Sequence, residues 1–87
     1  MNIESTGLIG LRVFTPTGFA LGDVSNIVVN IEKASVDGLF ITDTNRVLVE
    51  GGKAVYVPYR WVQSVGDVIL LKYFPKRVTA KIEEEEQ

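Results

Sequence analysis

The residue types that most often carry out chemistry in proteins are scarce in this sequence. Its 87 residues include no cysteine and no histidine, so thiolate chemistry, disulfides, imidazole bases and most zinc sites are excluded. Asp23, Asp37, Asp43 and Asp67 all lie at expected turns or strand ends, where aspartate commonly binds its own backbone. Glycines 51 and 52 are too few for a phosphate-binding loop. We therefore expect no catalytic residue, no metal and no cofactor, and a protein that is not an enzyme.

A second group of residues has the composition of a contact surface. Aromatic rings and arginine are the side chains most typical of protein interfaces. The candidates for partner binding are Tyr59, Arg60, Trp61, Tyr73 and Phe74. One hairpin joins the two ends of this group, so we expect the rings to lie close together, with Lys72 and Lys76 beside them. The alternative for each ring is packing in the core or as a lid.

The elements that would position these residues are strands. Alternation of apolar and polar residues, broken by glycine, proline and asparagine, predicts about six short strands. Pro58 ends one strand because it lacks an N–H group, and residues 59–61 are expected to form a tight turn of 3₁₀ type. Gly66-Asp67 predicts a hairpin. The strands are expected at residues 10–14, 19–31, 36–42, 46–50 and 53–57, and at residues 62–65 and 68–71 on either side of Gly66-Asp67.

The longest expected strand, residues 19–31, changes its apolar phase partway. Val24 is at an even position, whereas Ile27, Val29 and Ile31 are at odd ones. A β-bulge near Ser25-Asn26 would return all four side chains to one face. The side chains expected inside are Val24, Ile27, Val29, Leu39, Ile41, Val55, Val57, Val62, Val65 and either Val68 or Leu70.

Three segments have apolar residues at successive positions, which places apolar side chains on both faces of the expected strand. They are residues 27–29, 39–41 and 68–71, and a strand with one face in water should instead alternate. Either the N-terminal segment or the tail covers them, or a second subunit does. We favour a symmetric dimer that buries at least about 1,200 Å² in total. The candidates for its interface are Val28, Phe40, Ile69 and Leu71.

The charges are distributed unevenly along one expected domain, residues 1–76. The net charge is −2, and Glu83, Glu84, Glu85 and Glu86 supply four of the eleven acidic residues. Residues 77–87 are expected to form an acidic tail, either a short helix or disordered. The sequence pI of about 5.0 and the lack of a basic run argue against nucleic-acid binding. No apolar run reaches the roughly 20 residues of a membrane span, and we expect a cytoplasmic protein.

Two parts of the sequence carry a family resemblance. Residues 10–13 and 18–29, with the pattern Thr-Gly-x-x-Leu-Gly-Asp-Val, and residues 55–71, with Val-Pro-Tyr and Val-Gly-Asp-Val-Ile-Leu, resemble the PRC-barrel domain. That domain is named after the photosynthetic reaction-centre H subunit and occurs in the ribosome maturation factor RimM. The resemblance implies a small six-stranded β barrel that dimerises, here with a short C-terminal extension, and it supplies no catalytic residues.

The segment at residues 59–71, followed by Phe74-Pro75, looks most like the stand-alone archaeal PRC-barrel proteins. Members of that group are similar to the CdpB cell-division proteins. The resemblance implies an adaptor at the FtsZ ring that acts with SepF, as a homodimer or as a heterodimer with a paralogous PRC-barrel protein. It also implies a location at the division site. The alternatives are an RNA- or ribosome-associated factor similar to RimM, and an enzyme that works through carboxylates.

Overall fold

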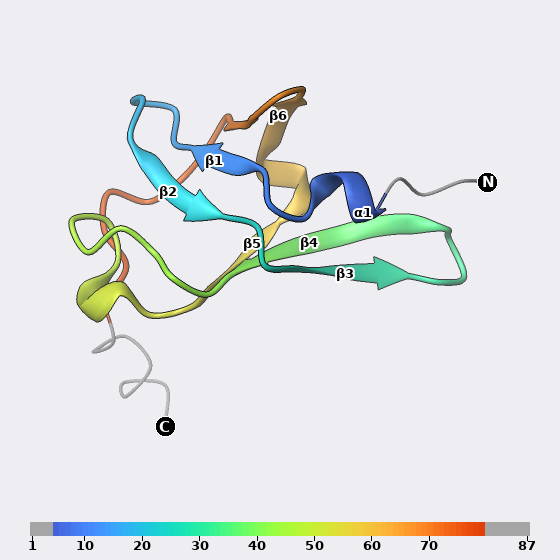
Figure 1. The fold of residues 1–87 in the computed structure, drawn as a ribbon, viewed down its shortest axis with the longest axis horizontal. Coiled ribbons are helices and arrows are strands. Elements are labelled where there is room, and N and C mark those ends of the chain that lie inside the picture. Colours follow the sequence, from blue (N-terminus) through green and yellow to red (C-terminus); the bar gives the residue numbers. More distant parts are fainter. Residues whose placement is uncertain (1–4, 80–87) are drawn as a thin grey trace.

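The computed structural model describes residues 5–79, which form two small β-sheets that share one core (Figure 1). One sheet has four strands in the order β2-β1-β7-β6, and the other has three in the order β3-β4-β5. The expected all-β class is confirmed, although the described residues form seven strands instead of six. The strands are β1 (Arg12–Phe14), β2 (Ala20–Asp23), β3 (Asn26–Asn30), β4 (Ser35–Ile41), β5 (Val55–Pro58), β6 (Val62–Val65) and β7 (Ile69–Leu71).

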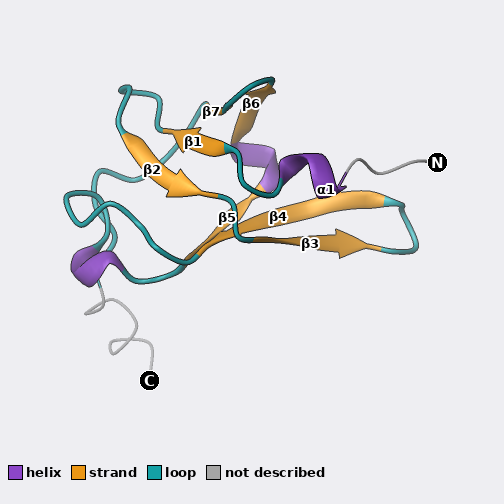
Figure 2. Ribbon diagram, in the orientation of Figure 1, coloured by secondary structure: helices purple, strands orange, loops and turns teal. Residues whose placement is uncertain are grey.

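Three short helical turns accompany the strands, and Figure 2 shows them in purple. The first, α1 (Ser5–Leu8), precedes β1 and brings Leu8 into the core. The second is the 3₁₀ turn η1 (Glu50–Gly52). The third, η2 (Tyr59–Trp61), directly follows Pro58, as the sequence predicts. The turn η2 therefore places Trp61 at the corner between the two sheets, because β5 belongs to one sheet and β6 to the other.

The expected single strand over residues 19–31 is wrong. The chain forms β2, leaves the four-stranded sheet, and enters the three-stranded sheet as β3. The backbone N–H of Val24 still donates to the carbonyl of Leu11 (2.9 Å), while that of Ser25 donates to Phe40 in β4 (2.8 Å). The apolar residues therefore change from even to odd positions because the chain passes from one sheet to the other at this point. No bulge is needed at Ser25-Asn26, and the irregular pairing in β3 lies instead between Val28 and Val29.

The expected strand at residues 46–50 is also wrong. Asn45 holds this segment as a turn: its side-chain oxygen accepts a hydrogen bond from the N–H of Val47 (2.8 Å), and its amide donates to the carbonyl of Ala20 (2.9 Å). Only Val49 makes a strand-like contact, an isolated parallel bridge to Val78. Residues 77–79 are therefore not helical, and the rest of the expected tail lies outside the described residues.

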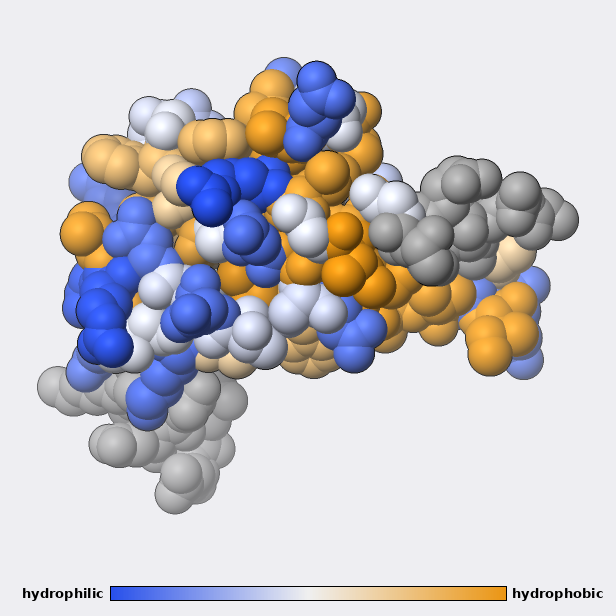
Figure 3. All heavy atoms as spheres, in the orientation of Figure 1, coloured by the Kyte–Doolittle hydropathy of each residue, from blue (hydrophilic) through white to orange (hydrophobic). Residues whose placement is uncertain are grey.

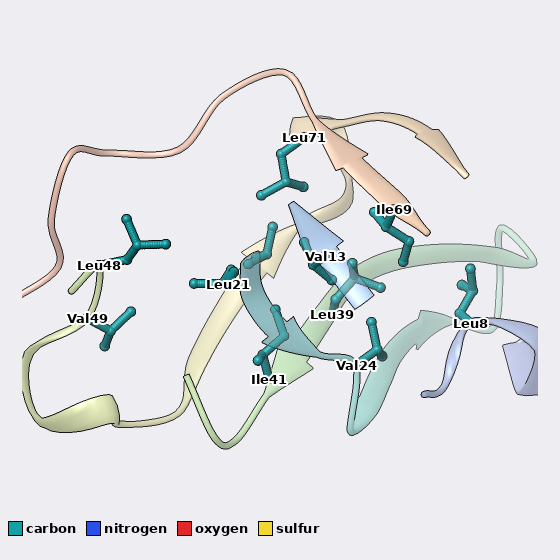
Figure 4. Packing of buried hydrophobic residues seen from close by; sticks show 11 residues of the cluster. Leu8, Val13, Leu21, Val24, Leu39, Ile41, Leu48, Val49, Ile69 and Leu71 are labelled. Carbon is teal, nitrogen blue, oxygen red and sulfur yellow. The ribbon is translucent and has the colours of Figure 1, made fainter. Parts of the chain in front are cut away.

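The core fills the space between the two sheets, as Figure 4 shows. Four of the expected core residues are buried: Val24, Leu39, Ile41 and Val57. Three others, Ile27, Val55 and Val62, are partly buried against them. The expectation is wrong for Val29 and Val65, which are exposed at the ends of their strands. The buried residues that the sequence analysis did not place inside are Leu8, Val13, Leu21, Leu48, Val49, Ile69 and Leu71.

The facing predicted for β7 is reversed in the structure. Ile69 and Leu71 are buried at 0% and 2% exposure, whereas Leu70 is 41% exposed. Val13 of β1 pairs in parallel with Ile69, and Phe14 with Leu70. Ile69 and Leu71 therefore belong to the core and do not offer surface to a second subunit. Val68 is half-buried in the turn before the strand.

Gly22 of β2 packs closely against Ile41 at the end of β4 and Asp43 in the loop that follows. Its φ is +154°, and a Cβ atom there would lie 2.7 Å from Cγ2 of Ile41 and 2.8 Å from the carbonyl oxygen of Asp43. Because the nearest oxygen belongs to the backbone, it cannot move aside easily. We expect Gly22→Ala to lower the free energy of unfolding by about 1–3 kcal/mol, the usual range for overpacking.

The measurement is urea unfolding followed by circular dichroism. Gly66→Ala is the matched control, because a Cβ atom at Gly66 would meet nothing within 4 Å. Its effect should stay within roughly 0.5 kcal/mol. Equal stability of the two variants would contradict the packing described for β2.

Candidate protein-interaction surface

Three of the predicted contact residues, Trp61, Tyr73 and Phe74, form an aromatic cluster. The ring of Trp61 lies 4.7 Å from that of Tyr73 and 6.3 Å from that of Phe74, measured between centroids, and both pairs meet edge to face. Edge-to-face packing is favourable because the positive rim of one ring meets the negative face of the other. The N–H of Lys72 donates to the carbonyl of Trp61 (2.8 Å), which ties the two segments together. The predicted proximity is confirmed, and the role in partner binding stays a prediction.

The members of the predicted contact group differ in how far they reach the surface. Tyr73 is 51% exposed, and Arg60 is also exposed. Tyr59, Trp61 and Phe74 are half-buried and pack against the core. The aromatic cluster is therefore fixed to the core on one side, while about half of the Tyr73 surface is open to a partner.

Next to the aromatic cluster lies a hollow that the sequence analysis missed, here called the Phe19 hollow. Its volume is about 260 Å³, and its wall includes Phe19, Leu48, Phe74, Pro75 and Lys76. Phe19 is 53% exposed, although it is a large apolar residue. The apolar wall and the lysine beside it suit a segment that carries both an apolar side chain and negative charge.

The turn between β1 and β2 presents Phe19 to the Phe19 hollow. Buried Thr15 organises this turn: its N–H donates to the carbonyl of Phe19 (2.8 Å), and its hydroxyl accepts from the N–H of Phe19 (3.1 Å). A threonine-proline-threonine-glycine run signals a turn, but the sequence does not show which surface the next residue joins. The position of Phe19 beside Phe74 depends on the tertiary fold alone.

A second hollow of about 430 Å³ opens on the outer face of the four-stranded sheet. Its wall includes Phe14, Pro16, Leu70 and Lys72, and it shares Thr15 with the Phe19 hollow. Phe14 and Leu70 are neighbours across the parallel pair of β1 and β7. The two hollows thus extend the aromatic cluster into a longer strip that is mainly apolar.

The charge around this strip is positive. Lys72 and Lys76 each line one hollow and are exposed, and no acidic residue lines either one among those described. Between residues 59 and 79 the only acidic residue is Asp67, which lies on the turn between β6 and β7. The Arg12–Asp23 ion pair (2.9 Å) lies on the β1–β2 pair. There the hydrogen bond and then the charge of Asp23 raise the pKa of Arg12.

The outer face of the three-stranded sheet carries a separate apolar surface, here called the Phe40 face and made of Val28, Phe40 and Tyr56. Phe40 and Tyr56 pair directly across β4 and β5, with ring centroids 5.4 Å apart. They are 38% and 44% exposed. The hydroxyl of Tyr56 donates to the carbonyl of Asp37 (3.1 Å), and its ring covers the space beside Gly38. The Phe40 face is therefore fixed in shape and open to solvent.

Apolar surface is not confined to these two regions. Figure 3 shows apolar atoms along the middle of the molecule and on the projecting β3–β4 hairpin. Ile31, just beyond β3, is 88% exposed. Two of the four predicted interface residues, Val28 and Phe40, belong to the Phe40 face, whereas Ile69 and Leu71 lie in the core. Whether any of this surface binds a second subunit stays a prediction.

The described residues, 5–79, show neither a membrane-spanning helix nor a cluster of metal ligands. No helix in this part of the chain is long and apolar enough to cross a membrane. The same residues contain no group of three or more acidic side chains that could hold a metal ion.

Comparison with known proteins places this arrangement in a family. The family model described as "PRC-barrel domain" matches residues 2–78, which is well over half of the chain. A search of curated proteins gives no match. The matched region contains both sheets, the aromatic cluster and both hollows.

Proposed function

The chain belongs to the PRC-barrel domain family, and we propose that it acts as a non-enzymatic adaptor that binds other proteins. PRC barrels are protein-interaction modules. The observation that carries the proposal is the aromatic cluster together with its surroundings. Tyr73 of the cluster is exposed, and the apolar walls of the two hollows and the lysines that line them lie beside it. Rigid rings with a charged rim are typical of the residues that dominate binding energy at interfaces.

We further propose a place for this adaptor in archaeal FtsZ-based cell division. The support is the likeness of residues 59–71 and Phe74-Pro75 to the stand-alone archaeal PRC-barrel proteins, which are similar to CdpB. In this role the protein would work at the division site in the cytoplasm, with SepF as its partner. The positive rim of the aromatic cluster favours a partner segment that is acidic or amphipathic.

We also propose that the working form is a dimer, either of two identical chains or with a paralogous PRC-barrel protein. The support is the Phe40 face. This apolar surface is exposed in a single chain, and covering it with a second copy would remove it from water, which is favourable. This face lies on the three-stranded sheet, whereas β6 and β7, which flank the aromatic cluster, belong to the four-stranded one. A dimer through the Phe40 face would therefore leave the aromatic cluster open for a partner.

Replacing Tyr73 with alanine tests the partner surface. We expect Tyr73→Ala to weaken binding to purified SepF from the same cells about ten-fold, a loss of roughly 1.4 kcal/mol that is typical of an interface aromatic residue. The melting temperature should change little, because half of the Tyr73 surface is in solvent. Isothermal titration calorimetry would measure the binding.

Ile31→Ala is the matched control for that experiment. Ile31 is an exposed apolar residue just beyond β3 of the three-stranded sheet and lines neither hollow, so its removal should leave the affinity unchanged. Unchanged SepF binding by the Tyr73 variant would rule out the aromatic cluster as the binding site. Absence of SepF binding by the natural protein would contradict the cell-division role.

A further inference from the structure

We infer that the acidic tail of this chain, residues 82–86, docks in the Phe19 hollow and competes there with the partner. The inference rests on the proposed function, because it takes the aromatic cluster and the hollow beside it as the partner surface. The observations that carry it are the point at which the chain leaves the described structure, the charge beside the hollow, and the composition of the tail.

Near its last described residue, the chain is bonded to the wall of the Phe19 hollow. The N–H of Val78 donates to the carbonyl of Leu48 (2.8 Å), and Leu48 itself lines the hollow. The guanidinium group of Arg77 donates to the carbonyls of Arg46 and Val47 (3.0 and 2.8 Å), which holds this end of the chain against the same turn. Three residues, 80–82, separate Thr79 from the first glutamate and can span up to about 10 Å. We infer that this reach brings the glutamates to the hollow while the described fold stays unchanged.

The tail and the hollow are complementary in chemistry. Residues 83–86 are four successive glutamates, and Ile82 precedes them. The hollow offers apolar walls from Phe19, Phe74 and Pro75, with Lys76 beside them. Ile82 would bury apolar surface against those rings, and the carboxylates would lie near Lys76 and near Lys72 on the adjoining hollow.

A weak contact is sufficient because the tail is tethered. A short tether gives an effective concentration in the millimolar range, so docking needs only a modest intrinsic affinity. Exposed ion pairs contribute little each and are weakened by salt, so the docked tail would be easy to displace. A partner would then bind with an apparent affinity reduced by the fraction of molecules whose hollow the tail occupies.

The single tryptophan of the chain offers a direct probe. Trp61 lies 6.3 Å from Phe74, which lines the hollow, so its emission should respond when the tail docks or leaves. The test compares the natural protein with a full-length variant in which Glu83, Glu84, Glu85 and Glu86 are all replaced by glutamine. At low salt we expect the emission of the two proteins to differ. Near 1 M salt the natural protein should approach the variant, since the Debye length falls to about 3 Å.

Two pairs of substitutions show which lysines are involved. Lys72→Ala combined with Lys76→Ala should reproduce the emission of the glutamine variant. Lys33→Ala combined with Lys53→Ala is the control, because both lysines are exposed and line neither hollow. A salt-sensitive emission that depends on Lys33 or Lys53 instead would overturn the docking site. An emission difference that grows with protein concentration would show a contact between chains and would overturn docking within one chain.

Partner binding separates this inference from the proposed function. We expect the glutamine variant to bind purified SepF about three- to ten-fold more tightly than the natural protein at low salt. If Tyr73→Ala weakens SepF binding but the glutamine variant binds and emits like the natural protein, the partner surface stands and tail docking is wrong. If the emission changes as expected but neither variant alters SepF binding, the tail docks and the competition with that partner is wrong.

Discussion

Ile69→Ala is expected to lower the free energy of unfolding by about 2–5 kcal/mol, the range measured for truncating a buried isoleucine. Ile69 is completely buried and pairs with Val13 at the centre of the four-stranded sheet. Truncation of its side chain would leave a cavity where β1 and β7 meet. The two strands could move together to fill this cavity only by breaking their backbone hydrogen bonds to each other or to β2 and β6. Urea unfolding at a fixed protein concentration would measure the change.

Leu70→Ala is the matched comparison for the Ile69 experiment. The two residues are adjacent on β7 and similar in size, but Leu70 lies on the outer face and is 41% exposed. We expect its truncation to cost less than about 1 kcal/mol, because surface substitutions rarely cost more. A larger cost for Leu70 than for Ile69 would show that β7 faces the way the sequence analysis expected.

The facing of β7 could not be predicted because its sequence contains no alternation. Val68, Ile69, Leu70 and Leu71 are all apolar, so either face could have been the inner one. The parallel pair with β1 decides the question, since Val13 must share a face with Ile69. That pair joins segments more than fifty residues apart, and no local pattern reports it.

The phase change in residues 19–31 was visible in the sequence, but its cause was not. A bulge and a passage between sheets both shift apolar residues from even to odd positions. The difference lies in the partners of two adjacent residues, Val24 and Ser25, which bond to Leu11 and to Phe40. The turns, by contrast, were predictable where proline restricts the backbone or glycine permits a tight turn, as at Pro58 and at Gly66-Asp67.

The candidate site was predictable only where one hairpin brings its parts together. Trp61 directly precedes β6, and Tyr73 follows shortly after β7. Because the two strands are antiparallel, both residues lie at the open end of the hairpin, and the sequence predicts that they are close. Phe14 and Phe19 come from the other end of the chain and reach the same strip through the parallel β1–β7 pair. The hollows, and with them a binding place for the tail, depend on this long-range contact.

Phe40→Glu is expected to convert the proposed dimer into monomers. Phe40 projects from the centre of the three-stranded sheet, with Tyr56 packed edge to face beside it. A dimer through the Phe40 face would bury both rings, and an unpaired carboxylate at the same place would be removed from water at a cost of several kcal/mol. In the monomer the new carboxylate stays in solvent, because Phe40 is already 38% exposed. Light scattering at micromolar concentration should therefore give half the mass of the natural protein, with circular dichroism unchanged.

Two further glutamate variants locate the interface. Ile31→Glu is the control, because Ile31 is 88% exposed on the hairpin beyond β3, and a charge there should leave the dimer intact. Leu70→Glu places the charge on the outer face of the four-stranded sheet. If Leu70→Glu dissociates the dimer and Phe40→Glu does not, the dimer interface lies on the strip that contains the two hollows. In that case a second copy would cover part of the surface proposed for the partner and the tail, and the dimer itself would have to open before either could bind.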